Sequence, residues 1–310
     1  MKVTPDYSII LVNYNGKHFL KDCLHSIKKE SEDLSLEVIL VDNNSNDGSR
    51  EFVKQNFPWV HLLKNENNVG FAVANNQAID LSSGRYILLL NPDTVIYSGA
   101  LKKMIEIIDN DHHIGALSCM LLNTDNSLQY SIGRFPSWYY QIAESLFLHR
   151  LFPSLNLTEL EFNKKKYNQF HEIDWAFGAA LIIRKSIFEK VGKLDEKFFF
   201  VSEEKDLCYR IKKAGWKIFY VPTAKILHHG RGWREDHNID KAIVKGRLRF
   251  AKKHYSKIKS GTYKLFLTMN VSIHCFIWLI ASFLLISKRT LAIHNFKKYS
   301  AVLKITLINN

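Results

Sequence analysis

The chain has 310 residues, of which 46% are hydrophobic, enough for one large α/β domain with an appended segment. Its four cysteines form no CxxC pair, which argues against a disulfide framework or a zinc site and predicts a reduced, cytosol-facing protein without a secretory signal. The net charge of +13 lies at one end, because residues 241–310 hold fourteen Lys or Arg and no acidic residue.

Apolar runs that end in polar turns alternate with stretches of helical periodicity. Strands are predicted over residues 7–13, 38–42, 60–63 and 86–90, with helical segments around residues 19–27, after residue 48 and up to residue 81. This alternation indicates right-handed βαβ units and a mostly parallel sheet. Further along, we predict a strand over residues 174–184, a helix over residues 203–214 and a strand over residues 218–221.

Residues 123–171 interrupt this regular pattern. They contain many aromatic side chains and a run of three lysines. The stretch is typical of a variable lid or an insertion that faces an acceptor, and a solvated loop explains it equally well.

The strand over residues 86–90 is apolar throughout and is followed by Asn91, Pro92 and Asp93. Ligands bind at the carboxyl ends of strands in open α/β sheets. Asp93 is a hard oxygen donor of the kind that Mg²⁺ or Mn²⁺ prefers beside a diphosphate. A turn aspartate is the alternative interpretation of this residue.

Six motifs in a fixed order carry a resemblance to a known family. They are SIILVNYNG (8–16), EVILVDNNSNDGS (37–49), NNVGFAVANNQA (67–78), GRYILLLNPDT (84–94), WAFGAALIIRK (175–185) and FFFVSEEKDLCYR (198–210). The chain resembles the inverting, family 2 nucleotide-sugar glycosyltransferases, and especially the rhamnosyltransferase-like bacterial members that build cell-surface polysaccharides. The resemblance implies a GT-A domain over residues 1–240, Rossmann-like, with a mostly parallel central sheet flanked by helices.

The resemblance also implies a donor site. Asp42 would accept the N3–H of uracil or thymine, so that the donor is a pyrimidine nucleotide sugar such as dTDP-rhamnose or a UDP-sugar; a helix cap or turn is the alternative. Asp93 would hold the divalent metal, with His228 as a second ligand, although the adjacent His229 leaves open which imidazole faces inward. Donor contacts are further implied for Asn13, Asn15, Asn76, Arg85 and Asn91.

The acidic pair Glu203 and Glu204 would stand at the start of a helix. The resemblance assigns Glu204 as the base that removes the acceptor proton in a single inverting displacement, with Glu203 as a positioning group. Acidic residues in a first helical turn also interact favourably with the helix dipole, so one of the two can have that role alone. Trp175 is a candidate for stacking on the acceptor, or a core aromatic residue.

Two positions depart from the family pattern. Asn91 replaces the first of two aspartates that are common in the metal motif. Glu204 is one methylene longer than the more usual Asp, which changes where an acceptor would be held.

Residues 265–286 contain no formally charged residue, so the run is long enough to span a bilayer or to lie in its interface. A buried core helix is the alternative, because Asn270, Ser272 and His274 dilute the run. Basic residues flank both ends of this apolar run, so the positive-inside rule does not assign it an orientation across the membrane. We expect residues 241–310 to form a helical region that binds an anionic membrane surface, peripheral or monotopic on the cytoplasmic face of the bacterial inner membrane, with residues 291–308 as a second amphipathic piece.

The expected function is therefore metal-dependent transfer of a sugar to a glycan acceptor, lipid-linked, in cell-surface polysaccharide synthesis. A sugar-nucleotide pyrophosphorylase would need a glycine- and arginine-rich first loop, but residues 13–16 hold a single glycine. A nucleic-acid partner is not expected, since an apolar run lies within the basic tail. A non-catalytic relative that binds a nucleotide sugar or a lipid stays open, because both Asn91 and Glu204 depart from the family pattern.

Overall fold

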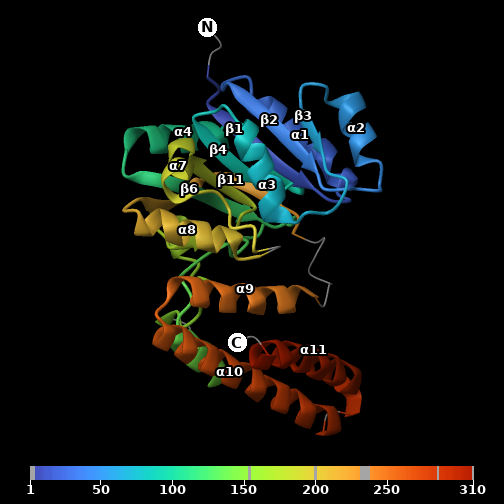
Figure 1. Ribbon diagram of the computed structural model, residues 1–310, viewed down its shortest axis with the longest axis vertical. Coiled ribbons are helices and arrows are strands. Elements are labelled where there is room, and N and C mark those ends of the chain that lie inside the picture. The colour runs from blue at the N-terminus through green and yellow to red at the C-terminus, as the bar shows by residue number, and fades with distance from the viewer. Residues whose placement is uncertain (1–3, 153–154, 199–200, 231–237, 285, 309–310) are drawn as a thin grey trace. The chain divides into compact units, whose positions relative to one another are not determined.

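The structure is a computed structural model that describes residues 4–152, 155–198, 201–230, 238–284 and 286–308 (Figure 1). It divides into two compact units. We call residues 1–133 with 164–230 the sheet unit, and residues 134–163 with 231–310 the helical unit. Residues 134–163, which the sequence-based boundary after residue 240 assigns to the first domain, thus cluster with the C-terminal region.

The elements of the sheet unit include the strands and helices that the sequence predicts. They are β1 (Tyr7–Asn13), α1 (Lys17–Glu30), β2 (Leu36–Asp42), α2 (Ser49–Asn56), β3 (His61–Lys64), α3 (Phe71–Leu81), β4 (Tyr86–Leu90), β5 (Thr94–Ile96), α4 (Ala100–Asn110), β6 (Ile114–Leu122), β7 (Ile132–Gly133), η2 (Lys166–Asn168), β8 (His171–Glu172), β9 (Trp175–Ala176), β10 (Ala180–Arg184), α7 (Lys185–Val191), α8 (Glu203–Lys213) and β11 (Lys217–His228).

The main sheet has the strand order β3-β2-β1-β4-β10-β6-β11-β5, with β8 paired to β11. The first four strands are parallel, so their carboxyl ends lie at one edge, where Asn13 pairs with Asp42 and Asp42 with Lys64. Alternate residues of β1, β2 and β4 pack in one core with apolar side chains of α1, α2 and α4. The α/β prediction is confirmed, but β10 runs antiparallel to both β4 and β6, so the sheet is mixed.

Two predicted strands have different bounds in the structure. The strand expected over residues 174–184 is interrupted, because β9 pairs with β7 in a separate two-stranded sheet and only β10 joins the main sheet. The last strand, expected to stop before Pro222, continues to His228 as β11. A register shift between Val221 and Lys225 accommodates the proline, since a bulge leaves a residue without a ladder hydrogen bond.

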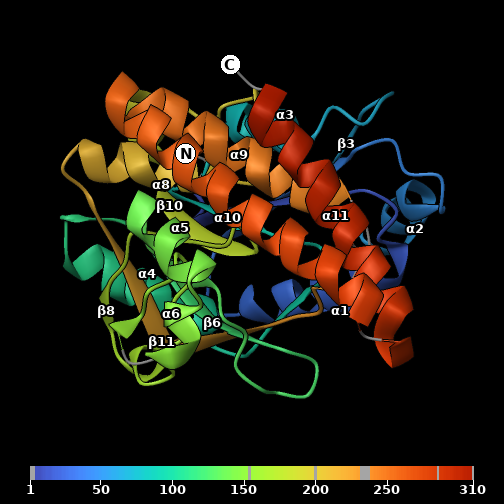
Figure 2. The same ribbon diagram turned by 90° about the horizontal axis from the view of Figure 1, so that it is seen from below.

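The helical unit contains five α-helices and a short 3₁₀ turn among its described residues: α5 (Trp138–Ser145), α6 (Leu148–Leu151), α9 (Asn238–His254), α10 (Lys257–Leu284), η3 (Ile286–Lys288) and α11 (Arg289–Ile308). Figure 2 shows α10 and α11 side by side. The Sγ of Cys275 lies 3.3 Å from the Oγ of Ser300, and the rings of His274 and Tyr299 stack with centroids 5.2 Å apart. Within the described residues, α10 is the one helix long and apolar enough to cross a membrane, which by itself is weak evidence.

Candidate functional site

Asp42 lies at the carboxyl end of β2, and its side chain is fully buried. Its Oδ1 accepts hydrogen bonds from the Ser45 backbone N–H at 3.0 Å and from Arg50 Nε at 2.6 Å. Its Oδ2 accepts one from Asn13 Nδ2 at 3.0 Å. Burial opposes ionisation of the carboxyl, but these hydrogen bonds hold the pKa of Asp42 below its usual value. The site thus contains a buried anion with lone-pair capacity left on Oδ2 for one more donor.

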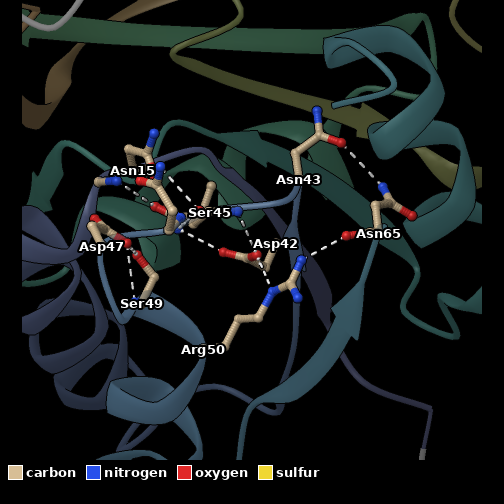
Figure 3. Close-up of polar contacts among 11 residues, drawn as sticks. Asn15, Asp42, Asn43, Ser45, Asp47, Ser49, Arg50 and Asn65 are labelled. Carbon is tan, nitrogen blue, oxygen red and sulfur yellow. Dashed lines mark hydrogen bonds and ion pairs between the residues drawn. The ribbon is translucent and has the colours of Figure 1, made fainter. Parts of the chain in front are cut away.

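The loops around Asp42 are held together by short polar side chains, as Figure 3 shows. Ser45 Oγ accepts a hydrogen bond from the Asn15 backbone N–H at 2.9 Å, and Asn15 Oδ1 accepts one from the Asn46 N–H at 2.8 Å. Arg50 also donates to the Asn65 carbonyl at 2.6 Å, which joins the ends of β2 and β3. Asn15 has a φ of 54°, a left-handed conformation that asparagine tolerates better than most residues. The sequence motif thus builds a rigid polar edge over the strand ends.

Asp93 and His228 meet at the same edge of the sheet. Asp93 Oδ1 lies 3.3 Å from His228 Nε2, and Asp93 Oδ2 accepts a hydrogen bond from the Gly230 N–H at 2.9 Å. Asn91 Nδ2 lies 3.2 Å from the same imidazole nitrogen. Burial opposes charge on Asp93, but His228 and the Gly230 N–H hold the pKa of this carboxyl below its usual value. The neighbouring His229 instead packs its ring near Phe19, with centroids 4.8 Å apart.

Gln129 determines which nitrogen of His228 faces Asp93. The Gln129 Nε2 donates to the Asn123 side-chain oxygen at 3.0 Å and to the His228 carbonyl at 3.3 Å. Its Oε1 is therefore the acceptor, and it lies 2.6 Å from His228 Nδ1. His228 must donate from Nδ1, so Nε2 is the nitrogen that faces Asp93. It can donate to the carboxylate as an imidazolium, and as a neutral ring it offers a lone pair to a metal.

These residues fit a divalent metal. A carboxylate oxygen and an imidazole nitrogen 3.3 Å apart are close enough to bind one ion, and both suit Mn²⁺ or Mg²⁺. The hydrogen bond from His228 to Gln129 is the kind of second contact that orients an imidazole ligand. No cluster of three or more His, Cys, Asp or Glu is present in the described part of the chain, so other ligands would have to complete the coordination. Phosphate oxygens commonly do so for Mg²⁺.

Glu203 and Glu204 form a buried acidic pair in the first turn of α8, with 4% and 8% of their surface exposed. Burial, followed by the neighbouring Glu204 charge, raises the pKa of Glu203 well above its usual value. Burial also raises the pKa of Glu204. Among the described residues, the Glu203 Oε2 has no hydrogen-bond partner. A carboxyl with a raised pKa is a stronger base when it is ionised, which suits proton removal from a hydroxyl.

The backbone that leads into α8 is strained. Val201 and Ser202 have φ values of 71° and 78°, in the left-handed region that β-branched residues in particular avoid. Such strain is tolerated where the surrounding structure fixes it, and it concentrates at functional sites. Phe199 and Phe200 of the same motif lie outside the described residues.

Contacts within the sheet unit place the ends of β1 and β4, the segment before β10 and the start of α8 close to one another. The Asn91 N–H donates to the Ala179 carbonyl at 3.0 Å, and a Cβ added to Gly178 would lie 3.7 Å from the Cβ of Glu204. The segment before β10 therefore lies between the end of β4 and the start of α8. Gly16, next to Asn13, lies against Pro92. Asn13, Asn15, Asp42, Asn91, Asp93, His228 and the two glutamates thus belong to one region of the sheet unit.

Asn76 and Arg85 are placed differently. The Asn76 Nδ2 donates to the Leu194 carbonyl and to Glu196 Oε1, each at 2.9 Å, and the Asn76 Oδ1 accepts a hydrogen bond from the Leu194 N–H at 3.0 Å. The Asn76 side chain therefore joins α3 to the segment after α7. Arg85 precedes β4 and pairs with Asp109 and Asp6, each at 3.0 Å. The amino end of a parallel strand points away from the edge where ligands bind. The structure therefore does not bring Arg85 to the site.

Trp175 is 5% exposed. The Lys205 ammonium lies 4.3 Å from its ring centroid, and the Phe177 ring stacks nearby with centroids 5.8 Å apart. A cation over the ring face is a stable arrangement by itself. The indole is thus packed within the sheet unit, in agreement with the core aromatic interpretation.

Sequence reasoning did not identify Ser45, Arg50 or Gln129. Ser45 and Arg50 lie within or next to a motif that was found, but their partners come from other loops. Gln129 lies in the irregular stretch after residue 123, where no periodicity or spacing marks it. Only the return of β11 to this edge brings Gln129 and His228 into contact.

Comparison with known proteins shows similarity to two bacterial rhamnosyltransferases. Over 238 residues the chain is 28% identical to an N-acetylglucosaminyl-diphospho-decaprenol L-rhamnosyltransferase of Mycobacterium tuberculosis, covering 73% of this chain and 77% of that protein. It is 24% identical over 229 residues to the rhamnosyltransferase WbbL of Escherichia coli, covering 71% of this chain and 82% of that protein.

Solved structures show the same fold. The mannosyltransferase PcManGT from Pyrobaculum calidifontis, solved with GDP-Man and Mn²⁺, superposes with a TM-score of 0.58 at 15% identity and covers 99% of this chain and 86% of that one. GalNAc-T7, solved with UDP, GalNAc and Mn²⁺, superposes with a TM-score of 0.61 at 15% identity, covering 99% of this chain and 58% of that one. The sheet unit therefore has the GT-A fold. The model of glycosyl transferase family 2 matches residues 8–192, which is more than half of the chain, and the protein belongs to that family.

Proposed function

We propose that the protein transfers a sugar, with inversion, from a pyrimidine nucleoside diphosphate to a lipid-linked glycan acceptor in cell-surface polysaccharide synthesis. The observation that carries this proposal is that the Asp93–His228 pair and the buried Glu203–Glu204 pair lie in one region of the sheet unit, where Asn91 bonds to Ala179 and Gly178 lies beside Glu204. The named activities of the mycobacterial and E. coli relatives support rhamnose as the sugar. The acceptor in the name of the mycobacterial relative supports a lipid diphosphate carrier as the acceptor here.

In the proposed reaction, the acceptor oxygen forms a bond to the anomeric carbon while the bond from that carbon to the diphosphate oxygen breaks. The electron pair of the breaking bond leaves with the nucleoside diphosphate. The acceptor proton passes to Glu204, whose pKa burial raises. Glu203, with the higher pKa of the pair, stays protonated and avoids a second buried negative charge.

The donor end would be bound by the polar edge around Asp42, whose Oδ2 can accept the imide N–H of a uracil or thymine ring. Asp93 and His228 would hold the divalent metal, which when bound stabilises the negative charge that develops on the leaving diphosphate. Asn91 stands where a second carboxylate is common, so the pair brings a single carboxylate to the metal.

Calorimetry with UDP, dTDP, GDP and ADP, each with and without Mn²⁺, tests the donor site. We expect metal-dependent binding of one pyrimidine diphosphate, lost in Asp93→Ala and retained in Asp80→Asn, which removes an exposed carboxylate elsewhere. Preferential binding of GDP would contradict the assigned role of Asp42.

Sugar transfer is then measured with dTDP-rhamnose as donor and a polyprenyl-diphosphate N-acetylglucosamine as acceptor. We expect Glu204→Gln to lower kcat by about 10²–10⁴-fold without abolishing nucleotide binding.

A further inference from the structure

The α10 helix carries an apolar stripe that the described residues leave exposed. Leu265, Met269, Phe276, Ile280 and Phe283 retain between 40% and 72% of their accessible surface. Their spacings of four, seven, four and three residues place them on one side of the helix. The stripe runs along about 27 Å of helix. A soluble monomer rarely exposes so continuous an apolar surface, which indicates a binding face.

Exposed basic residues lie on α11, the helix that packs beside α10. On α11, Arg289, Lys297 and Lys304 are exposed, and their spacings of eight and seven residues place them on a shared side of that helix. From residue 241 onward the chain has fourteen Lys or Arg and no Asp or Glu. An apolar stripe beside a helix with exposed basic residues matches an anionic lipid surface, which offers acyl chains beneath negative headgroups.

The opposite side of α10 packs in the core of the helical unit through Leu267 and Val271, and it also carries a polar network. Asn270 donates to Gln141 Oε1 and to Glu144 Oε2, each at 3.2 Å, near the middle of the helix. About two turns earlier, the Tyr263 hydroxyl donates to Glu159 Oε1 at 3.0 Å. Arg247 lies on this cluster, with its Nε 3.4 Å from the other oxygen of Glu159. Asn270, which seemed to dilute an apolar run, is thus part of a buried polar network.

This network determines how α10 can meet a membrane. If the helix crossed the bilayer, Glu144, Glu159 and Arg247 would lie at the depth of the hydrocarbon beside it, where charged groups are costly. The exposed stripe, in contrast, can enter the interface while the network stays on the other side of the helix. Length and composition alone do not distinguish these two arrangements.

We propose that the helical unit docks on an anionic bilayer with α10 lying in the plane of the interface. The stripe faces the acyl chains, and the basic residues of α11 face the headgroups. The proposal rests on the proposed function only for its setting, since it supplies the surface by which the enzyme would reach a lipid-linked acceptor.

Vesicle co-sedimentation of the full chain tests the docking surface. We expect binding to vesicles of phosphatidylcholine with 30% phosphatidylglycerol, little binding to pure phosphatidylcholine, and weaker binding at high salt. Phe276→Ser with Phe283→Ser should lower the affinity at least tenfold, as should Lys297→Glu with Lys304→Glu. The matched control, Leu81→Ser with Tyr97→Ser, removes two exposed apolar side chains of the sheet unit and should bind like the parent.

Nucleotide binding is measured on the same variants. Retained nucleotide binding shows that each variant is folded, and it separates a failure of this proposal from a failure of the proposed function. Parental vesicle affinity in both double variants would overturn the proposal. The proposal would also be overturned if the protein formed a stable dimer through this stripe in solution and did not bind vesicles.

Membrane depth tests the orientation of α10. Spin labels are placed at Leu265→Cys, Phe276→Cys and Phe283→Cys in a Cys275→Ser background, since the other three cysteines are buried. An in-plane helix predicts similar shallow depths at all three positions, and release of the protein by alkaline carbonate. Resistance to carbonate, with residue 276 much deeper than residues 265 and 283, would show a spanning helix and overturn the proposal.

Discussion

The Oε1 atom of Gln129 lies 2.6 Å from the Nδ1 atom of His228, and the amide nitrogen of the same glutamine donates to the His228 carbonyl. One side chain therefore fixes both the ring and the backbone of the imidazole that faces Asp93. Hydrogen bonds of this kind raise the affinity of an imidazole for a metal by orienting it and selecting its tautomer.

Gln129→Leu should weaken Mn²⁺ binding in the presence of UDP or dTDP by about 10–100-fold, because the imidazole loses its orienting acceptor. Titration calorimetry measures the metal affinity, and ¹⁵N spectra of the imidazole report which nitrogen carries the proton. Gln129→Glu keeps an oxygen near Nδ1 and should retain most of the affinity. An unchanged affinity and tautomer in Gln129→Leu would show that Gln129 only packs against β11.

Glu203→Gln should stabilise the protein at neutral pH. The pKa of Glu203 is raised in the folded state, so between its ordinary value of 4.5 and its folded value the native state holds a proton that the unfolded state has lost. Stability therefore falls as the pH rises through this window. The glutamine removes that penalty, and we expect a gain of about 1–3 kcal/mol at pH 7.5 that vanishes near pH 4.5. Thermal unfolding across this range measures the gain, and a gain that is independent of pH would contradict the raised pKa.

The rate of transfer should fall on the acidic side at a pH above the ordinary value of a glutamic acid, because burial raises the pKa of Glu204 and only its ionised form accepts a proton. The pH dependence of kcat locates this limb. Glu204→Asp should retain the acidic limb of the pH profile but with a lower kcat, because its carboxylate is one methylene further from the acceptor. A limb that persists in Glu204→Gln would assign the base to another residue.

Arg50→Ala should destabilise the sheet unit by about 3 kcal/mol, because it leaves the fully buried Asp42 carboxylate without its cation. Asp42 has a lowered pKa, so its ion pair contributes stability above its ordinary value of 3.8, and this contribution is lost as the pH falls through the folded value. The difference between variant and parent should therefore shrink in acid. Chemical denaturation at pH 7 and pH 3 measures both quantities.

Arg85→Ala is the matched control for that experiment. Arg85 also pairs with aspartates, but its side chain and that of Asp109 are 43% and 38% exposed, so we expect a cost of about 0–1 kcal/mol. Nucleotide affinity should be unchanged in Arg85→Ala and reduced in Arg50→Ala. A reduced nucleotide affinity in Arg85→Ala would return Arg85 to the donor site.

The sequence predicted the strands whose apolar runs stop at polar residues, and with them the positions of Asp42 and Asp93 at one edge. It did not predict α4 or β6, and it cut β11 short at Pro222, because a bulge that absorbs a proline leaves no mark in the periodicity. Asn76 was assigned to the donor by motif alone, and its bonds to Leu194 come from a segment 118 residues away. Contacts of such range depend on the packing of whole elements, so local patterns contain little information about them.

The reversed direction of β10 separates the two halves of the reaction along the chain. The loops that would hold the nucleotide are exits from β1, β2 and β4, whereas residues 178–179, which lie beside Glu204, are the approach to β10. In the proposed site, a substitution at residue 178 would act on the side of Glu204, whereas residue 179 is bonded through its carbonyl to Asn91 at the exit of β4.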